Sequence, residues 1–367
     1  MAVRAHPVFG YGLGNFEYAF MHFHQPSSEY LRYAKTTIFA HNGLLQTAVD
    51  AGLPALFFLV WGFRNIAAAF ISSRQDKHAV VTSWYFMGLL VYAVTSLFNY
   101  SLFLPFNGLV FSACIGLLLQ GNDAREATVP IQYFQLLFKI LLIFFCCFLL
   151  LLGISDLFAQ RGRYDMAARI MPMKSDYWYQ LALGELQKNE NPNSGAMRYD
   201  QALVDLKKAA LWDSHNPFIW SRIARVLSAE QNAENRPAIE AAFQKAEEIA
   251  PQHAPFWVEH AFYLLSVQDW EGGRLNFQRA ALLEPSTPLP LYGLGLIAMH
   301  RNEFSEALRM FLSAKSMKEN QPKVEDQSSY NRELLSTPYG EYLYSVDINS
   351  IDRLMAQCSS HMSLVPH

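Results

Sequence analysis

Apolar and polar residues are distributed differently in the two halves of the chain. Up to about Ser155 the apolar residues come in long blocks, and from Gln160 onward they are spaced among charged residues. Blocks of about 20 apolar residues are typical of helices that cross a bilayer, whereas regularly spaced apolar positions are typical of amphipathic helices. The pattern predicts an all-α protein: a multi-span transmembrane helical region in residues 1–158, then a soluble helical domain in residues 160–318.

The apolar runs are each about long enough to cross a hydrocarbon core of ~30 Å. They are residues 54–71, 80–98, 102–119 and 131–154. Arg64 and Asn65 interrupt the first run, so a buried amphipathic helix is an alternative there. Arg74 and Lys77 follow the first run and Arg125 follows the third, whereas the link after the second carries no charge. Because cytoplasmic loops favour positive charge, we expect a multi-pass protein of the bacterial inner membrane with its C-terminal half on the periplasmic side.

A short helix is predicted just before the first apolar run. Asn42 is a plausible N-cap for residues 43–51, and Gly52 can close that helix in a left-handed conformation. Pro54 then suits the first turn of the next helix. This arrangement puts His41 at the outer edge of the membrane. A histidine there can take part in chemistry, or it can simply lie at a wet interface.

Three glycines alternate upstream, in the stretch "GYGLGNF" that contains Gly10, Gly12 and Gly14. They do not follow the pattern of a dinucleotide-binding turn, and no strand precedes them, so we expect a close-packed loop and no nucleotide cofactor. The four cysteines show no metal-binding or disulfide spacing. The net charge of −3 gives no reason to expect a nucleic-acid partner.

The C-terminal half repeats itself. Matching anchor positions recur at intervals of 42, 37 and 34 residues: Trp178, Trp220, Trp257 and Leu291. A small residue follows each anchor four positions later: Ala182, Ala224, Ala261 and Gly295. The second helices carry the related segments "FQKAEEIAP", "FQRAALLEP" and "FLSAKSMKE". Small residues let paired helices approach closely, and the large ones fill the space between neighbours.

This pattern resembles tetratricopeptide repeats over residues 178–318. Such helix pairs stack into an α-solenoid with a concave face, which implies a protein partner on the repeat domain. The aromatic anchors themselves are expected to be core residues. Residues 319–367 form a polar C-terminal tail to which the sequence assigns no role.

The stretches "HPVFGYGLGNFEYAF" and "RYAKTTIFAHNGLLQTAVDAGLPALFFL" resemble the O-antigen ligase and polymerase family. The family's glycine-rich segment, His-Asn pair and following glycine match Gly10, Gly12 and Gly14, then His41 and Asn42, then Gly52. The resemblance covers residues 1 to about 158. It implies a membrane glycosyltransferase that passes a glycan from a polyprenyl-diphosphate carrier to a lipid A core, a polysaccharide or a protein, without metal or cofactor.

The resemblance also implies roles for individual residues. His41, with Asn42 beside it, would deprotonate or position the acceptor hydroxyl, since neutral imidazole accepts a proton near neutral pH. Arg32 and Lys35 are candidates for binding the carrier's diphosphate, although any surface loop can carry such charges. The family arginine and the spans upstream of the glycines have no counterpart here. We therefore expect the C-terminal part of a ligase, inactive alone.

A second hypothesis assigns no chemistry to the chain. It is then a membrane-anchored tetratricopeptide scaffold that recruits proteins, and His41 and the glycines can be replaced without consequence. Loss of the concave repeat face abolishes function under the scaffold hypothesis, whereas loss of His41 abolishes it under the ligase hypothesis.

Overall fold

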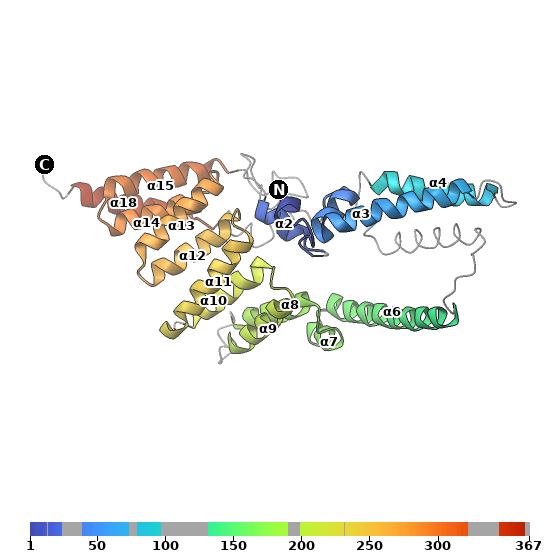
Figure 1. Cartoon of the computed structure of the whole chain (residues 1–367). Coiled ribbons are helices and arrows are strands. Elements are labelled where there is room, and N and C mark those ends of the chain that lie inside the picture. The colour runs from blue at the N-terminus through green and yellow to red at the C-terminus, as the bar shows by residue number, and fades with distance from the viewer. Residues whose placement is uncertain are drawn as a thin grey trace. The chain divides into compact units, whose positions relative to one another are not determined.

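The computed structural model describes residues 1–12, 14–23, 39–72, 79–96, 131–189, 199–230, 232–321 and 345–363. Every regular element in these ranges is helical (Figure 1). The described residues up to Leu157 form one compact unit, and those from Phe158 onward form a second. The all-α prediction therefore agrees with the described part of the chain.

The first unit contains long apolar helices and a short N-terminal segment. Its elements are α1 (Ala2–Ala5), α2 (Phe16–Phe23), α3 (Gly43–Ser72), α4 (Ala79–Ser96) and most of α6 (Ile131–Gln160). Within the described ranges, two helical segments, Gly43–Ala68 and Ile143–Gln160, are long and apolar enough to cross a membrane. The apolar part of α4, Phe86–Ser96, is shorter. The predicted span 102–119 lies outside the described residues.

Helix α3 is bent at Gly52, which has φ 81° and ψ 178°. Since this backbone conformation ends a right-handed helix, residues 43–51 form a short helix of their own, and Pro54 follows in the first turn of the next. Asn42 caps the short helix, because its Oδ1 accepts a hydrogen bond from the Leu45 backbone N at 2.9 Å. The predicted cap and break are both confirmed.

The second unit is a stack of antiparallel helix pairs. The short helix α7 (Tyr164–Ile170) precedes it, and each helix of a pair contacts its partner more extensively than it contacts the next pair. The pairs are α8 (Ser175–Asn189) with α9 (Tyr199–Trp212), α10 (Pro217–Ala229) with α11 (Arg236–Ile249), α12 (Ala254–Ser266) with α13 (Trp270–Leu283), and α14 (Pro288–His300) with α15 (Phe304–Glu319). A 3-10 turn, η3 (Ala233–Asn235), precedes α11. This is a tetratricopeptide-like α-solenoid.

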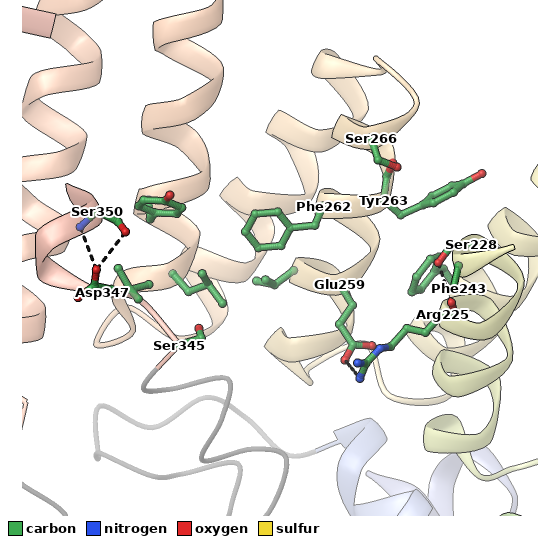
Figure 2. Close-up of a pocket in the computed structure, with 15 residues that line it drawn as sticks. Arg225, Ser228, Phe243, Glu259, Phe262, Tyr263, Ser266, Ser345, Asp347 and Ser350 are labelled. Atoms are coloured by element: carbon green, nitrogen blue, oxygen red, sulfur yellow. Dashed lines mark hydrogen bonds and ion pairs between the residues drawn. The ribbon is translucent and has the colours of Figure 1, made fainter. Parts of the chain in front are cut away.

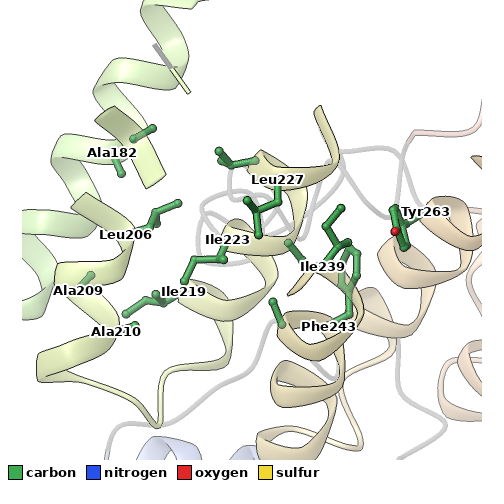
Figure 3. Close-up of a cluster of buried hydrophobic side chains, with 14 of the residues drawn as sticks. Ala182, Leu206, Ala209, Ala210, Ile219, Ile223, Leu227, Ile239, Phe243 and Tyr263 are labelled. Atoms are coloured by element: carbon green, nitrogen blue, oxygen red, sulfur yellow. The ribbon is translucent and has the colours of Figure 1, made fainter. Parts of the chain in front are cut away.

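The repeat signature explains the packing. The small residues four positions after three of the anchors are fully buried: Ala182, Ala224 and Ala261. The second-helix phenylalanines are at most 1% exposed: Phe243, Phe277 and Phe311. Figure 3 shows one cluster of this core, in which Leu206, Ile219 and Ile239 from three successive helices point toward one another. The predicted core role is confirmed for the phenylalanines, whereas the anchors Trp178, Trp220 and Trp257 are only partly buried and pack against the core.

The tryptophan anchors have a second function that their spacing does not reveal. Each indole Nε1 donates a hydrogen bond to the backbone carbonyl six residues earlier, in the turn that leads into its helix. These bonds are Trp178 to Pro172 at 2.8 Å, Trp220 to Ser214 at 2.9 Å and Trp257 to Pro251 at 3.1 Å. The three tryptophans therefore hold the turn that precedes each of α8, α10 and α12. Leu291, at the fourth anchor position, has no group that can make this bond.

The C-terminal region contains a helix that sequence analysis did not predict. Helix α18 (Ile348–Ser363) lies within the segment interpreted as a polar tail, and it packs against α15. Ile351 and Cys358 are fully buried, and the ring of His361 stacks on Phe304 with centroids 4.7 Å apart. Helix α18 therefore covers the last helix pair, as the outer helix of a repeat stack must.

Candidate functional site

The first candidate site is the N-terminal loop against the bend of α3. Three backbone hydrogen bonds hold it there: Tyr11 N to Val49 O at 2.8 Å, Gly12 N to Asp50 O at 2.9 Å and Leu53 N to Pro7 O at 2.8 Å. The loop thus satisfies carbonyl groups at the end of the short helix 43–51, which otherwise have no intrahelical partner. Residues 7–12 and 49–53, far apart in sequence, form one structure.

Glycines make this close approach possible. A Cβ atom on Gly52 would lie 2.3 Å from the Val8 carbonyl oxygen, and one on Gly10 would lie 2.5 Å from the Asp50 carbonyl group. Gly12 and Gly14 have φ values of 95° and 83°, in the range that side chains disfavour. Each of the four glycines singled out in the sequence therefore takes a left-handed backbone conformation, and two of them also exclude a side chain by contact.

His41 directly precedes Asn42 and the short helix 43–51. Its φ is 50°, an uncommon value for a residue with a side chain, and the residue is exposed. The side chain of the adjacent Asn42 caps α3 by accepting a hydrogen bond from the Leu45 backbone N. Arg32 and Lys35, the candidate diphosphate-binding residues, lie outside the described residues. The structure places His41 directly before the short helix 43–51, whose other end contacts the glycine loop, and the described residues provide no geometry for a diphosphate site.

A buried polar chain supports the backbone next to His41. The side-chain oxygen of Gln46 accepts a hydrogen bond from the Ala40 backbone N at 2.7 Å, and its amide nitrogen donates to the Asp50 carboxylate at 2.9 Å. Gln46 is 1% exposed and Asp50 2%. Sequence analysis missed both residues. The available signal was a Gln and an Asp four positions apart. Residues at this spacing lie on the same face of a helix, and this helix is otherwise apolar.

The second candidate site is a groove in the repeat unit. Its volume is about 710 Å³. Side chains from the first helices of three successive pairs line it, together with Phe243 of α11, the segment that precedes α18 and Ser350 of α18 (Figure 2). The lining residues include Arg225 and Ser228 from α10, Glu259, Phe262 and Ser266 from α12, Leu289 and Tyr292 from α14, and Ser345, Val346 and Asp347. First helices of a solenoid form its concave face, so this groove is the concave surface that the repeat pattern predicts.

Two carboxylates line the groove, and each accepts hydrogen bonds from neighbouring residues. Glu259 accepts a hydrogen bond from the Ser221 hydroxyl and pairs with Arg225 at 3.5 Å. Asp347 accepts hydrogen bonds from the backbone N of Ser350 at 3.1 Å and from its hydroxyl at 3.0 Å. The Ser350 hydroxyl bond in particular holds the pKa of Asp347 below its ordinary value. Both carboxylates therefore already accept hydrogen bonds from neighbouring residues.

Three further titratable groups lie in the repeat core. His253 precedes α12 and packs against the rings of Phe218 and Phe256, and its burial lowers its pKa to about 3. His260 Nδ1 lies 2.8 Å from Glu247 Oε1, and both side chains are less than 10% exposed. Because the His260 ring also stacks on Phe243 at 4.9 Å, this pair is enclosed in the wall of the stack.

A surface ion cluster joins the last two pairs. Arg274 and Arg301 both pair with Glu271, the latter at 2.6 Å, and these hydrogen bonds, with Arg274 first, lower the pKa of Glu271 to about 2. Among the described residues, no group of three or more His, Cys, Asp or Glu side chains could hold a metal ion.

No family model matches the chain, and no curated protein matches it. Among solved structures, a crystal structure of MamA is 17% identical with a TM-score of 0.38, covering 45% of this chain and 95% of that one. YrrB, titled a TPR protein with an unusual peptide-binding site, is 15% identical with a TM-score of 0.37, covering 47% of this chain and 86% of that one. PilF of Pseudomonas aeruginosa is 22% identical with a TM-score of 0.35, covering 50% of this chain and 76% of that one. Similarities at this level carry no conclusion about partner or activity.

Proposed function

We propose that this chain is a membrane-anchored scaffold whose repeat unit binds a segment of a partner protein. The observation that carries the proposal is the groove of about 710 Å³ that crosses α10, α12 and α14. It combines aromatic and aliphatic side chains with a few polar groups, which is the composition of a site that recognises a ligand.

The anchoring part of the proposal is supported by the exposed apolar side chains of the first unit. Helix α6 exposes Ile143, Phe144 and Leu150 by 64%, 77% and 65%, and α3 exposes Phe57 by 64%. A helix that is apolar on all sides requires an apolar environment, and a bilayer supplies one. We propose the bacterial inner membrane, with the repeats on the periplasmic side, from the arginine and lysine pattern of the links.

Photo-crosslinking in cells tests the scaffold function. A photoreactive amino acid at Phe262 or Tyr292 should yield a discrete crosslink to a partner protein, because these positions line the groove. The same amino acid at Leu282, which is 74% exposed and does not line the groove, is the control. Equal crosslinking from all three positions, or none from the groove, would contradict the proposal.

Reporter fusions test the topology separately. Fusions after Asn122 and after Gln160 should report the cytoplasm and the exterior respectively, since α6 lies between them. Two reporters on the same side would show that α6 does not cross the membrane.

A second candidate function is glycan transfer from a polyprenyl-diphosphate carrier to a glycan, lipid or protein acceptor. The observation that favours it is His41, which is exposed with φ 50° and precedes the short helix whose other end contacts the glycine loop. Uncommon backbone conformations cluster at functional sites. In a longer protein that restores the upstream spans, His41→Ala should abolish transfer and preserve membrane insertion. His41→Gln separates positioning from proton transfer, and normal transfer by the alanine variant would end this assignment.

A further inference from the structure

The last turn of α6 is fixed to the repeat unit. Gly162 has φ 72°, and its backbone N donates a hydrogen bond to the Ala159 carbonyl at 2.9 Å. The backbone N of Arg163 donates to the Phe158 carbonyl, also at 2.9 Å, which completes the pattern that ends a helix at a glycine. The residues from Phe158 onward belong to the repeat unit, in which α7 packs against α8. The last turn of α6, helix α7 and the first helix pair are therefore parts of one structure.

Three large apolar side chains are exposed at one end of the first pair. Met173, in the turn before α8, is 50% exposed, and Leu211 and Trp212, at the end of α9, are 76% and 49% exposed. The Ser175 hydroxyl donates a hydrogen bond to the Ala209 carbonyl at 3.0 Å, so the start of α8 lies beside the end of α9. All three apolar side chains therefore lie at the end of the pair where the chain arrives from α6 and α7.

The exposed tryptophan distinguishes the first pair from the third. Trp212 and Leu283 occupy the same position, six residues after the buried core residue of their helices, yet Leu283 is only 3% exposed. Leu211 and Leu282 also correspond, and Leu282 is 74% exposed, so an exposed leucine at this position does not by itself indicate a contact. The first pair differs because an exposed indole ring lies next to its exposed leucine.

Basic side chains accompany these apolar ones. They are Arg161, Arg163, Arg169 and Lys174 between α6 and α8, and Lys207 and Lys208 near the end of α9. The acidic side chains of the same segments are Asp165, Asp176, Asp205 and Asp213, so six basic groups face four acidic ones. Two of the acidic groups pair within this set: Asp165 with Arg163, and Asp205 with Lys208. Lys207 is exposed and lies four residues before Leu211, on the same face of α9. This end of the repeat unit therefore combines exposed apolar groups with a positive excess.

We propose that this end of the first pair lies on the lipid surface at which α6 leaves the membrane, with Met173, Leu211 and Trp212 in the headgroup layer. Tryptophan and long basic side chains are typical of the boundary between hydrocarbon and water. Anionic lipid headgroups attract the basic groups, and the apolar side chains reach the edge of the acyl chains. The inference rests on the proposed membrane anchoring, and it holds for either leaflet because both expose lipid phosphates.

Fluorescence quenching by lipids tests the inference on the full chain in vesicles of phosphatidylcholine and phosphatidylglycerol. An environment-sensitive fluorescent amino acid replaces Leu211, and the quenchers are lipids that carry a doxyl group either near the headgroup or deep in the acyl chain. The matched control is the same amino acid at Leu282, which has the equivalent position and nearly equal exposure. We expect the headgroup-level quencher to reduce the Leu211 signal roughly fivefold more than the Leu282 signal.

Charge reversal tests the contribution of the headgroups. Lys207→Glu should lower the quenching at Leu211 about twofold or more, and raised salt should lower it in the wild-type chain. Lys245→Glu, at an exposed position of α11, is the matched control and should leave the quenching unchanged. Circular dichroism checks that both variants remain folded. Unchanged quenching in the Lys207→Glu variant would overturn the attraction between this end of the pair and anionic lipid.

The same amino acid at Leu150, which is 65% exposed on α6, tests the anchoring separately. Quenching at Leu150 without quenching at Leu211 would overturn the inference and leave the anchored scaffold standing. Loss of quenching at both positions would overturn the anchoring as well. A blue-shifted signal at Leu211 that lipid does not quench would show that protein covers this end, such as a second copy of the chain, and would also overturn the inference.

Discussion

Glycine serves different purposes in the two units. In the first, Gly52 and Gly10 have positive φ values, and backbone atoms of another segment occupy the place of their side chains. In the repeat unit, Gly293 and Gly295 lie inside α14 with helical backbone, and aromatic rings occupy that place. Phe277 would lie 2.3 Å from a Cβ on Gly293. The loop therefore depends on backbone conformation, and the stack depends on the fit of side chains.

The first prediction concerns the loop, where the effect should be largest. Gly52→Ala places a Cβ 2.3 Å from a backbone oxygen at φ 81°, so strain and steric overlap add. Each costs up to about 3 kcal/mol, for a combined loss of up to about 6 kcal/mol. Trypsin should then cut after Arg4 at least tenfold faster in the detergent-solubilised chain. Gly62→Ala is the control, because its Cβ would meet nothing within 4 Å. Equal cutting rates in the two variants would mean that the loop does not depend on Gly52.

The second prediction concerns the stack. Phe277 is 0% exposed, and Phe277→Ala should lower the free energy of unfolding of the repeat unit by about 3–5 kcal/mol. Chemical denaturation followed by circular dichroism measures this. Gly293→Ala alone should also lower the free energy of unfolding of the repeat unit. In the presence of Phe277→Ala it should lower it little, because the ring that the new methyl group would contact is gone. Additive effects of the two substitutions would show that ring and glycine are not coupled.

The third prediction concerns pH. His253 has a pKa of about 3 in the folded chain and 6.5 as its ordinary value, so between these pH values the unfolded chain binds the additional proton. The contribution of His253 to stability is complete above pH 6.5 and decreases as the pH falls. At pH 5 the loss is about 2 kcal/mol. Chemical denaturation of wild type and His253→Gln at pH 7 and pH 5 measures this loss. The free energy of unfolding of the variant should decrease less from pH 7 to pH 5 than that of wild type. An equal pH response in both chains would assign the proton uptake to other groups.

The fourth prediction has the smallest expected effect. Trp257→Phe keeps most of the ring packing and removes the hydrogen bond to Pro251. The expected loss is about 1 kcal/mol, the usual net contribution of one hydrogen bond. A thermal melt of the two chains measures it. If Trp257→Phe melted at the wild-type temperature, the indole bonds would not be fixing the turns.

Several features could be predicted from sequence because they depend on local backbone chemistry. Asn42 and Gly52 define the ends of the short helix by their cap and turn preferences. The buried alanines and phenylalanines follow from the repeat spacing. Helix α18 was missed although Ile351, Leu354, Met355 and Cys358 recur at helical spacing, because the polar residues between them dominate the composition.

Other features depend on contacts between distant residues. Nothing in the local sequence pairs residues 7–12 with residues 49–53, because those bonds join main-chain atoms that every residue has. The Gln46–Asp50 chain depends on which helix face is buried. The groove residues Arg225 and Glu259 lie on different helix pairs, so their meeting follows from the stacking and not from any local motif. The ligase resemblance, by contrast, stays a hypothesis for His41.

The indole bonds give the repeat unit a built-in optical reporter. Trp178, Trp220 and Trp257 each report one turn: the turn of Trp178 precedes the first pair, and those of Trp220 and Trp257 separate neighbouring pairs. When a turn opens, its indole passes from a fixed, partly shielded position into water, and its emission should shift to longer wavelength. Single-tryptophan versions of the chain would therefore show in which order the pairs separate. Solenoids can open from an end or from within, since each repeat contacts only its neighbours, and fluorescence would distinguish the two routes.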